Sequence, residues 1–158
     1  MNPEDILLSP DAIWHERVAA LGVLPPYDDG VKAIQSGKMY PKNVQKSLQD
    51  KNVCPIIRVI PFMELKSRQK NHLLEKLDEP LVCVIVLVEQ DDEIRMAAFE
   101  KVTNINLLYL ILRYSFDVEM RKNAACKIPA EFSHLLRTAL WLETNPEVRD
   151  CISENLVK

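Results

Sequence analysis

Glycine is almost absent from this chain: Gly22, Gly30 and Gly37 are its three glycines, and none follows in residues 38–158. Loops that cradle the phosphates of a nucleotide or dinucleotide need glycine where the backbone approaches the phosphate, so such sites are excluded from that region. Two-residue hairpin turns also favour glycine, which argues against a β-meander, sandwich or small barrel there. The sequence therefore predicts helices joined by short polar turns.

The composition and the start of the chain point to one globular domain over residues 1–158. The chain is 47% hydrophobic and 27% charged, with a formal net charge of −3, which suits a single domain with a sizeable core. Residues 1–10 carry acids ahead of a short apolar run, unlike a secretory signal. The longest apolar run, 81–88, is far shorter than the roughly twenty residues of a membrane span. We expect a cytoplasmic protein that does not bind a membrane.

A short pattern recurs three times in the second half of the chain. Each copy has an acidic residue, an apolar residue and an arginine, and a residue that can cap a helix stands four positions before the arginine. Apolar residues then recur at steps of four, which places them on one stripe of a helix. The arginines are Arg95, Arg121 and Arg149; the caps are Asp91, Asp117 and Asn145; the stripes are Ile94, Ala98 and Val102, then Met120, Ala124 and Ile128, then Val148, Ile152 and Leu156.

A second apolar segment precedes each arginine helix, at residues 81–89, 105–116 and 132–142. The first is apolar all round, the second is nearly so, and the third is amphipathic, an order expected when stacked helical pairs approach a terminal layer. We predict such pairs over residues 63–158, closed by a capping helix over 146–158 that begins with a proline. In the third segment, Phe132, Leu135, Leu136, Ala139 and Leu140 share one face, and His134, Arg137, Thr138 and Trp141 share the opposite one.

The arginine pattern with its paired apolar helix resembles HEAT-type repeats, including their short bacterial relatives and the leucine-rich-repeat variant. The resemblance covers roughly Glu64 to Lys158 and extends to Ser9–Leu24, where Arg17 begins a similar run. It implies an all-α fold, a right-handed α-α superhelix, and a protein-binding scaffold; no cofactor is expected. Some proteins with such repeats bind DNA and act as base-excision enzymes, and others are bilin lyases or hydroxylases, whose active-site motifs this chain lacks.

Residues 1–62 are predicted to form an irregular set of short helices. Ser9-Pro10-Asp11 has the form of a helix cap followed by proline in the first turn, so we expect a helix from there to Gly22. Short helices are also expected over 28–36 and from Tyr40 to Leu48. In residues 53–61 the β-branched side chains would suit a strand, but two prolines and the lack of a partner favour a helix and a loop.

The polar face of the third segment is the first candidate for function. His134, Arg137, Thr138 and Trp141 form a stripe that includes a large aromatic residue, and tryptophan and arginine are enriched at interface hot spots. Tyr109 and Arg113 form the corresponding edge one layer earlier. We predict that these side chains bind a protein or peptide, with a homodimer as one form of that interaction; packing of the stripe against the last helix is the open alternative. The acids, histidines and nucleophiles are scattered, so we do not expect an enzyme.

A basic segment offers a second candidate function. Residues 38–76 contain nine basic and three acidic residues, which gives this segment a charge of +6 and leaves −9 on the rest of the chain. Such a surface could bind phosphate or nucleic acid, although aromatic side chains are sparse in it and the pI of about 5.7 argues against this partner. The residues that would carry it are Lys42, Lys46, Arg58, Lys66, Arg68 and Lys70.

The remaining polar and thiol groups are given structural roles. Each repeat arginine can bond the capping Asp or Asn of an adjacent turn, and the three would then form a ladder that ties the layers together. The four cysteines have no Cys-x-x-Cys pair and no histidine at ligand spacing, so neither a zinc site nor a disulfide framework is indicated. We expect them to be small buried hydrophobic residues.

Overall fold

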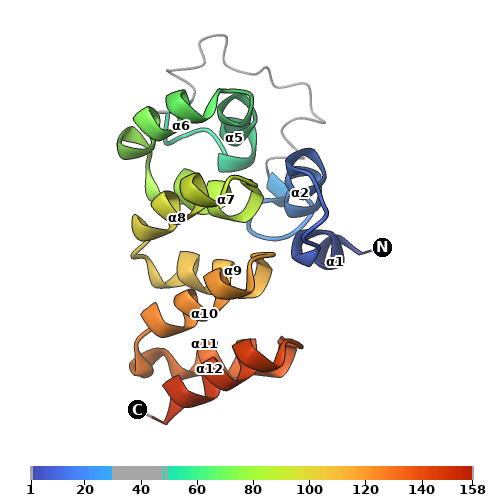
Figure 1. The fold of residues 1–158 in the computed structure, drawn as a ribbon, viewed down its shortest axis with the longest axis vertical. Coiled ribbons are helices and arrows are strands. Elements are labelled where there is room, and N and C mark those ends of the chain that lie inside the picture. Colours follow the sequence, from blue (N-terminus) through green and yellow to red (C-terminus); the bar gives the residue numbers. More distant parts are fainter. Residues whose placement is uncertain (1, 30–47, 49, 158) are drawn as a thin grey trace.

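Helices account for all the regular structure that the computed structural model describes, which comprises residues 2–29, 48 and 50–157 (Figure 1). These residues form ten α-helices and two short 3-10 helices and contain no strand, as the predicted all-α class requires. The helices expected over 28–36 and from Tyr40 to Leu48 fall mostly outside the described residues. The α-helices are α1 Pro3–Leu8, α2 Trp14–Leu21, α5 Pro55–Met63, α6 Ser67–Leu73, α7 Glu79–Val88, α8 Asp92–Glu100, α9 Ile105–Tyr114, α10 Val118–Lys127, α11 Ser133–Leu142 and α12 Pro146–Leu156, and the 3-10 helices are η1 Leu74–Lys76 and η2 Ala130–Phe132.

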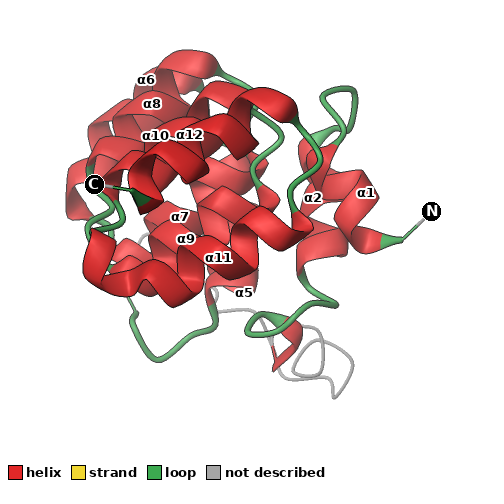
Figure 2. Ribbon diagram, turned by 90° about the horizontal axis from the view of Figure 1, so that it is seen from below, coloured by secondary structure: helices red, strands yellow, loops and turns green. Residues whose placement is uncertain are grey.

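Helices α5 to α12 lie in two rows (Figure 2). We call α5, α7, α9 and α11 the first row and α6, α8, α10 and α12 the second row. Along the first row α7 contacts α5 and α9, and α9 contacts α11; across the rows α7 contacts α8, α9 contacts α10, and α11 contacts α12. The apolar segments thus form the first row, and the three arginine helices lie in the second row. The predicted boundary at residues 62 and 63 falls at the end of α5, within this arrangement.

The predicted caps start the second-row helices. The side chains of Asp91, Asp117 and Asn145 each accept hydrogen bonds from the backbone N–H groups two and three residues ahead, at 2.9–3.3 Å. Asn104 does the same for α9, at 2.9 and 3.2 Å. These bonds satisfy N–H groups that no helical carbonyl can reach. These helices therefore begin directly after the capping residues that the sequence predicted.

The core follows the periodicity of the sequence. Residues 81–88 of α7 are at most 1% exposed, because α5, α8, α9 and α2 surround this helix. The three apolar stripes of the arginine helices also face inward, and only Leu156, at the end of α12, is partly exposed. On α11, Leu136 and Ala139 are buried. The predicted order of an enclosed, a nearly enclosed and an amphipathic helix is confirmed along α7, α9 and α11.

Residues 55–61 are helical rather than extended, and residues 53 and 54 precede the helix as an irregular segment, as the predicted helix and loop require. Pro55 opens α5, where its missing N–H is not needed. Pro61 lies inside the helix and cannot donate to the carbonyl four residues earlier, and α5 ends at Met63. Ile56, Val59 and Phe62 are buried, so the β-branched content fills the helical core face.

The first two helices lie beside the stack rather than in line with its rows (Figure 1). The Gln90 side chain, after α7, donates to the Ala12 carbonyl at 3.2 Å, and the Arg17 guanidinium of α2 lies 3.7 Å from the centre of the Phe116 ring, after α9. Helices α1 and α2 therefore pack against the turns that lead from α7 to α8 and from α9 to α10, and in addition α2 contacts α5 and α7 and α1 contacts α9.

The predicted start of α2 was wrong. Ser9 closes α1 instead of opening α2, and its hydroxyl accepts the N–H of Asp11 at 3.4 Å in the turn between the two helices. The cause is an earlier start signal, because Asn2 caps α1 through the N–H of Asp5 and Pro3 occupies its first turn. Helix α2 begins at Trp14 and ends before Gly22, as expected for its end.

Candidate interaction surface

The polar stripe of α11 faces away from the rest of the fold. His134, Arg137, Thr138 and Trp141 are all exposed, and Trp141 has 86% of its surface accessible. The opposite face of α11 packs on the core through Leu136 and Ala139. The division of α11 into an apolar face and a polar face, predicted from the sequence, is thus correct. Because the four polar side chains are exposed, they do not pack against α12.

These side chains make few contacts of their own. The Thr138 hydroxyl donates to the His134 carbonyl at 2.9 Å, one turn back on the same helix. Within the ranges 2–29, 48 and 50–157, Arg137 and Trp141 make no hydrogen bond, ion pair or ring contact. An indole and a guanidinium held on a packed helix without intramolecular partners keep their full capacity for a partner molecule.

The stripe continues at its C-terminal end into a small hollow. Leu142, next to Trp141, is 47% exposed and lines a hollow of about 200 Å³ between α1 and the ends of α9 and α11. Arg113, one of the predicted contact residues, lies in the same hollow, with its guanidinium 5.2 Å from the Tyr114 ring centre. The other lining residues are Glu4, Asp5, Leu8, Tyr114, Glu143 and Thr144.

Tyr109 does not share this surface fully. Its side chain is half-buried and packs against the core. Arg113 is also half-buried, but it is brought near the stripe through Leu142. The predicted set therefore divides into three parts: the four exposed residues of α11, Arg113 at the hollow, and Tyr109, which mainly packs α9 against the core.

Two members of the predicted phosphate-binding set are buried in ion pairs. Arg58, 1% exposed, donates to both carboxylate oxygens of Asp78, one at 3.0 Å, and to the Leu48 carbonyl. Lys70 is 7% exposed and lies 2.9 Å from a Glu89 carboxylate oxygen. Burial of these cations against acids removes them from any surface that could meet phosphate, which corrects their prediction as binding residues.

The other members of that set do not form a described cluster. Lys66 and Arg68 are exposed on and before α6, whereas Lys42 and Lys46 lie outside the described residues. A hollow of about 800 Å³ lies against α6. Its lining residues are Leu48, Leu65, Arg68, Gln69, Asn71, His72 and Leu73. Among the members of the set that the structure describes, Arg68 is the one that lines it.

The repeat arginines share a contact that the sequence did not reveal. Each donates to the carbonyl of the residue that closes the preceding helix: Arg95 to Glu89 at 2.9 Å, Arg121 to Ser115 at 2.6 Å and Arg149 to Glu143 at 2.8 Å. These carbonyls have no partner within their own helix, and a cation there also complements the helix dipole. The arginine therefore joins the two helices of one pair.

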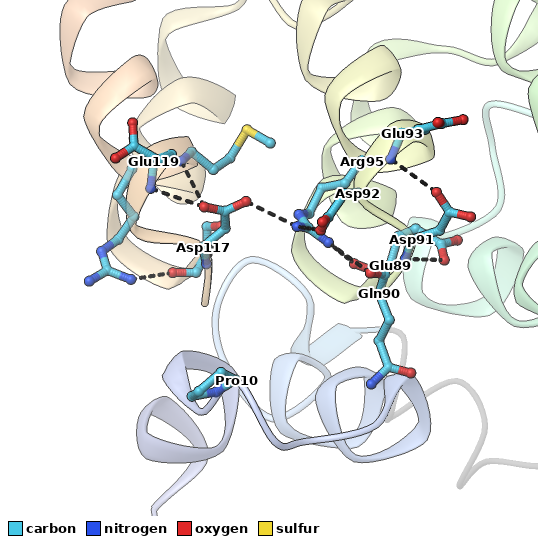
Figure 3. A network of polar contacts seen from close by, with 12 residues as sticks. Pro10, Glu89, Gln90, Asp91, Asp92, Glu93, Arg95, Asp117 and Glu119 are labelled. Atoms are coloured by element: carbon cyan, nitrogen blue, oxygen red, sulfur yellow. Dashed lines mark hydrogen bonds and ion pairs between the residues drawn. The ribbon is translucent and has the colours of Figure 1, made fainter.

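The same arginines also join neighbouring pairs. Arg95 lies between Asp92 and Asp117 and is 3.0 Å from an Asp117 oxygen, so this rung of the predicted ladder is confirmed (Figure 3). Arg121 instead bonds Glu143 at 3.2 and 3.3 Å, and not the capping Asn145. A carboxylate is the stronger acceptor for a guanidinium, which explains the choice.

Lys70 takes the arginine position in the pair before. It stands four residues after Lys66, as Arg95 stands four residues after Asp91, and it pairs with Glu89 of the next layer. That spacing was the signal that could have placed Lys70 in the ladder. Arg149, on α12, is exposed and forms no ion pair within residues 2–29, 48 and 50–157.

Arg17 repeats the contact in the first helical pair. It donates to the carbonyl of Ser9, which closes α1, at 3.0 Å. The Phe116 ring lies against both Arg17 and Arg95, at 3.7 and 4.6 Å from their guanidinium carbons. Burial, reinforced by the charge of Arg95, lowers the pKa of Arg17 to about 10. The pair α1–α2 and the pair α7–α8 are thus joined through the Phe116 ring, which both guanidinium groups contact.

The cysteines divide into three environments. All four thiols are free; Cys83 is buried as expected, and Cys54 and Cys151 are half-buried. Cys126 is exposed, so the expectation of burial was wrong for it. It occupies the outer side of α10, beyond Ala124 and Ala125, which face the core. Its sulfur lies 3.5 Å from the sulfur of Cys151 on α12.

The part of the chain that the structure describes holds neither a cluster of metal ligands nor a membrane-spanning helix. No group of three or more His, Cys, Asp or Glu side chains there could hold a metal ion. None of its helices is long and apolar enough to cross a membrane. His15, His72 and His134 lie on α2, α6 and α11.

Comparison of this chain with models of protein families, with curated proteins and with solved structures finds no match.

Proposed function

We propose that this chain is a non-catalytic protein-protein interaction module, in which a right-handed superhelix of HEAT-like helical pairs presents the outer face of α11 to a protein or peptide. The observation that carries the proposal is the 86% exposure of Trp141 on a helix whose other face is fixed in the core. An exposed tryptophan costs hydration free energy in the free protein, which a partner's apolar surface would recover.

The stripe combines an aromatic anchor with positive charge. Arg137 lies one turn before Trp141, and both are exposed. Leu142 adds apolar surface at the edge of the hollow that Arg113 lines. This composition suits a partner segment that offers an apolar side chain for the indole and a carboxylate for the guanidinium.

The N-terminal helices leave this face open. Helices α1 and α2 pack on α5, α7 and α9 and on the turns after α7 and α9, and the four side chains of the stripe stay exposed. The ladder of buried cations, which consists of Lys70, Arg95 and Arg121, holds successive helical pairs together. A partner therefore meets a surface that is already ordered, which lowers the entropic cost of binding.

Self-association is tested by the molar mass in solution, measured by light scattering near physiological salt. If the partner is a second copy, we expect the natural chain to dimerise and Trp141→Ala to weaken the dimer about 30-fold, since hot-spot truncations cost about 2 kcal/mol or more. The free energy of unfolding of the monomer should change by less than about 0.5 kcal/mol, because the side chain is exposed.

Val157→Ala is the matched control, because Val157 is 85% exposed and lies beyond α12. A dimer that persists equally in the natural chain and in both variants would contradict self-association through α11. A monomer in all three leaves a different protein or peptide as the partner.

A further inference from the structure

Two thiols from different helical pairs lie close together at the surface. Cys126, on α10, and Cys151, on α12, have their sulfur atoms 3.5 Å apart. A disulfide bond needs about 2.05 Å between the sulfurs. The remaining distance is small enough to be closed by side-chain rotation and a slight approach of the two helices.

The neighbouring contacts hold α10 and α12 in this register. The Asn155 side-chain amide donates to the carbonyls of Ala125 and Ile128, at 2.6 and 3.1 Å. On the other side, the Lys122 ammonium lies 3.7 Å from a Glu147 carboxylate oxygen. Polar contacts therefore hold the two helices together on both sides of the thiols.

We propose that Cys126 and Cys151 form a reversible disulfide by exchange with a low-molecular-weight disulfide such as oxidised glutathione. In the first step, the Cys126 thiolate attacks one sulfur of the small disulfide, a mixed disulfide forms, and one small thiolate leaves. In the second step, the Cys151 thiolate attacks the Cys126 sulfur and expels the second small thiolate. The cysteine pair loses two electrons, the small disulfide gains them, and its two thiolates take up the two cysteine protons.

The environments of the two thiols indicate which of them reacts first with the small disulfide. Cys126 is exposed and meets the small disulfide first. Cys151 is half-buried, and its thiol donates to the Lys122 carbonyl at 3.6 Å. Burial, together with the neighbouring Cys126 sulfur, raises the pKa of Cys151 to about 11. Cys151 is therefore a poor first nucleophile and acts on the mixed disulfide once its target sulfur is adjacent.

The bond would join α12 to α10 covalently and close a loop that contains α11. This site is separate from the α11 stripe, and the inference does not rest on the proposed function. Closing a loop of this length constrains the unfolded chain, so we expect the oxidised protein to melt about 5–10 °C higher than the reduced protein.

The test is incubation of the natural chain with excess oxidised glutathione, followed by intact-mass measurement and peptide mapping without reduction. We expect a chain lighter by two hydrogen atoms, a peptide linking Cys126 to Cys151, and return to the starting mass with dithiothreitol. Cys151→Ser should instead hold one glutathionyl group on Cys126, and Cys126→Ser should form no bridge. Circular dichroism of both variants establishes that they fold.

Cys54→Ser is the matched control, because Cys54 is half-buried on a different helix end, and it should form the bridge like the natural chain. A natural chain that carries glutathione on Cys126 without bridging overturns the proposal. So does a natural chain that stays unmodified, a bridge that involves Cys54 or Cys83, or a folded oxidised protein whose melting temperature equals that of the reduced one.

Discussion

Arg121→Ala should destabilise the fold by about 3–5 kcal/mol, the range for removing one partner of a buried ion pair. The Arg121 side chain is 7% exposed and its partner Glu143 is 9% exposed. The substitution leaves that carboxylate without its counterion and leaves the Ser115 carbonyl, at the end of α9, without a donor. Urea unfolding followed by circular dichroism measures the loss.

Arg149→Ala is the matched control, because Arg149 holds the same position in the last arginine helix. It donates to the Glu143 carbonyl as Arg121 does to Ser115, but it is exposed and forms no ion pair among the described residues. We expect a cost below about 1 kcal/mol. Replacing both members of the inner pair, in Arg121→Met with Glu143→Leu, should recover part of the lost stability. Equal costs for the two arginines would contradict the ladder between layers.

Raising the pH from 9 to 12 should destabilise the fold through Cys83 by roughly 4 kcal/mol, if the shift acts in full. Burial raises the pKa of the Cys83 thiol to about 12, from about 9 when exposed; the hydroxyl of Tyr27 opposes this shift and Glu79 adds to it. The folded protein holds the thiol proton more tightly than the unfolded chain does. Unfolding therefore releases a proton in this window, and the stabilising contribution present below pH 9 is lost as the pH rises.

Cys83→Ser separates this contribution from that of other groups. A serine hydroxyl does not titrate in this window, yet it can still accept from the Tyr27 hydroxyl and donate to the Leu107 carbonyl, the two partners of Cys83. With reductant present, the free energy of unfolding of the natural chain should fall more steeply with pH than that of the variant, by up to about 1.4 kcal/mol per pH unit. Parallel curves for the two proteins would be inconsistent with a buried, neutral thiol.

The parts of the fold that sequence reasoning predicted depend on local signals. Asp91 and Asp117 cap their helices through N–H groups two and three residues away, and that contact is contained in the sequence around each cap. The exposure of Trp141 likewise follows from the period of one amphipathic helix. Such features could be predicted because each depends on one segment of the chain.

The features that were missed depend on contacts between distant segments. Arg58 and Lys70 were predicted to be surface cations. They are buried because Asp78 and Glu89, at the two ends of α7, pair with them. The position of α2 beside the stack depends on the Phe116 ring, far along the chain from Arg17. For Lys70 the four-residue spacing from Lys66 was a local signal of its place, whereas no local pattern reports the counterion of Arg58, so the burial of Arg58 is decided by the tertiary fold.

Site-specific photo-crosslinking from position 141 tests the central claim, that the outer face of α11 binds a protein or peptide. A photoreactive phenylalanine replaces Trp141 in one full-length chain and Val157 in another, and crosslinked peptides are identified by mass spectrometry after irradiation in the cells that make the protein. We predict one defined partner segment joined to position 141 and absent from position 157, whose affinity for the purified chain falls about 30-fold in Trp141→Ala. An absence of crosslinks at position 141, or the same crosslinks from both positions, would contradict it.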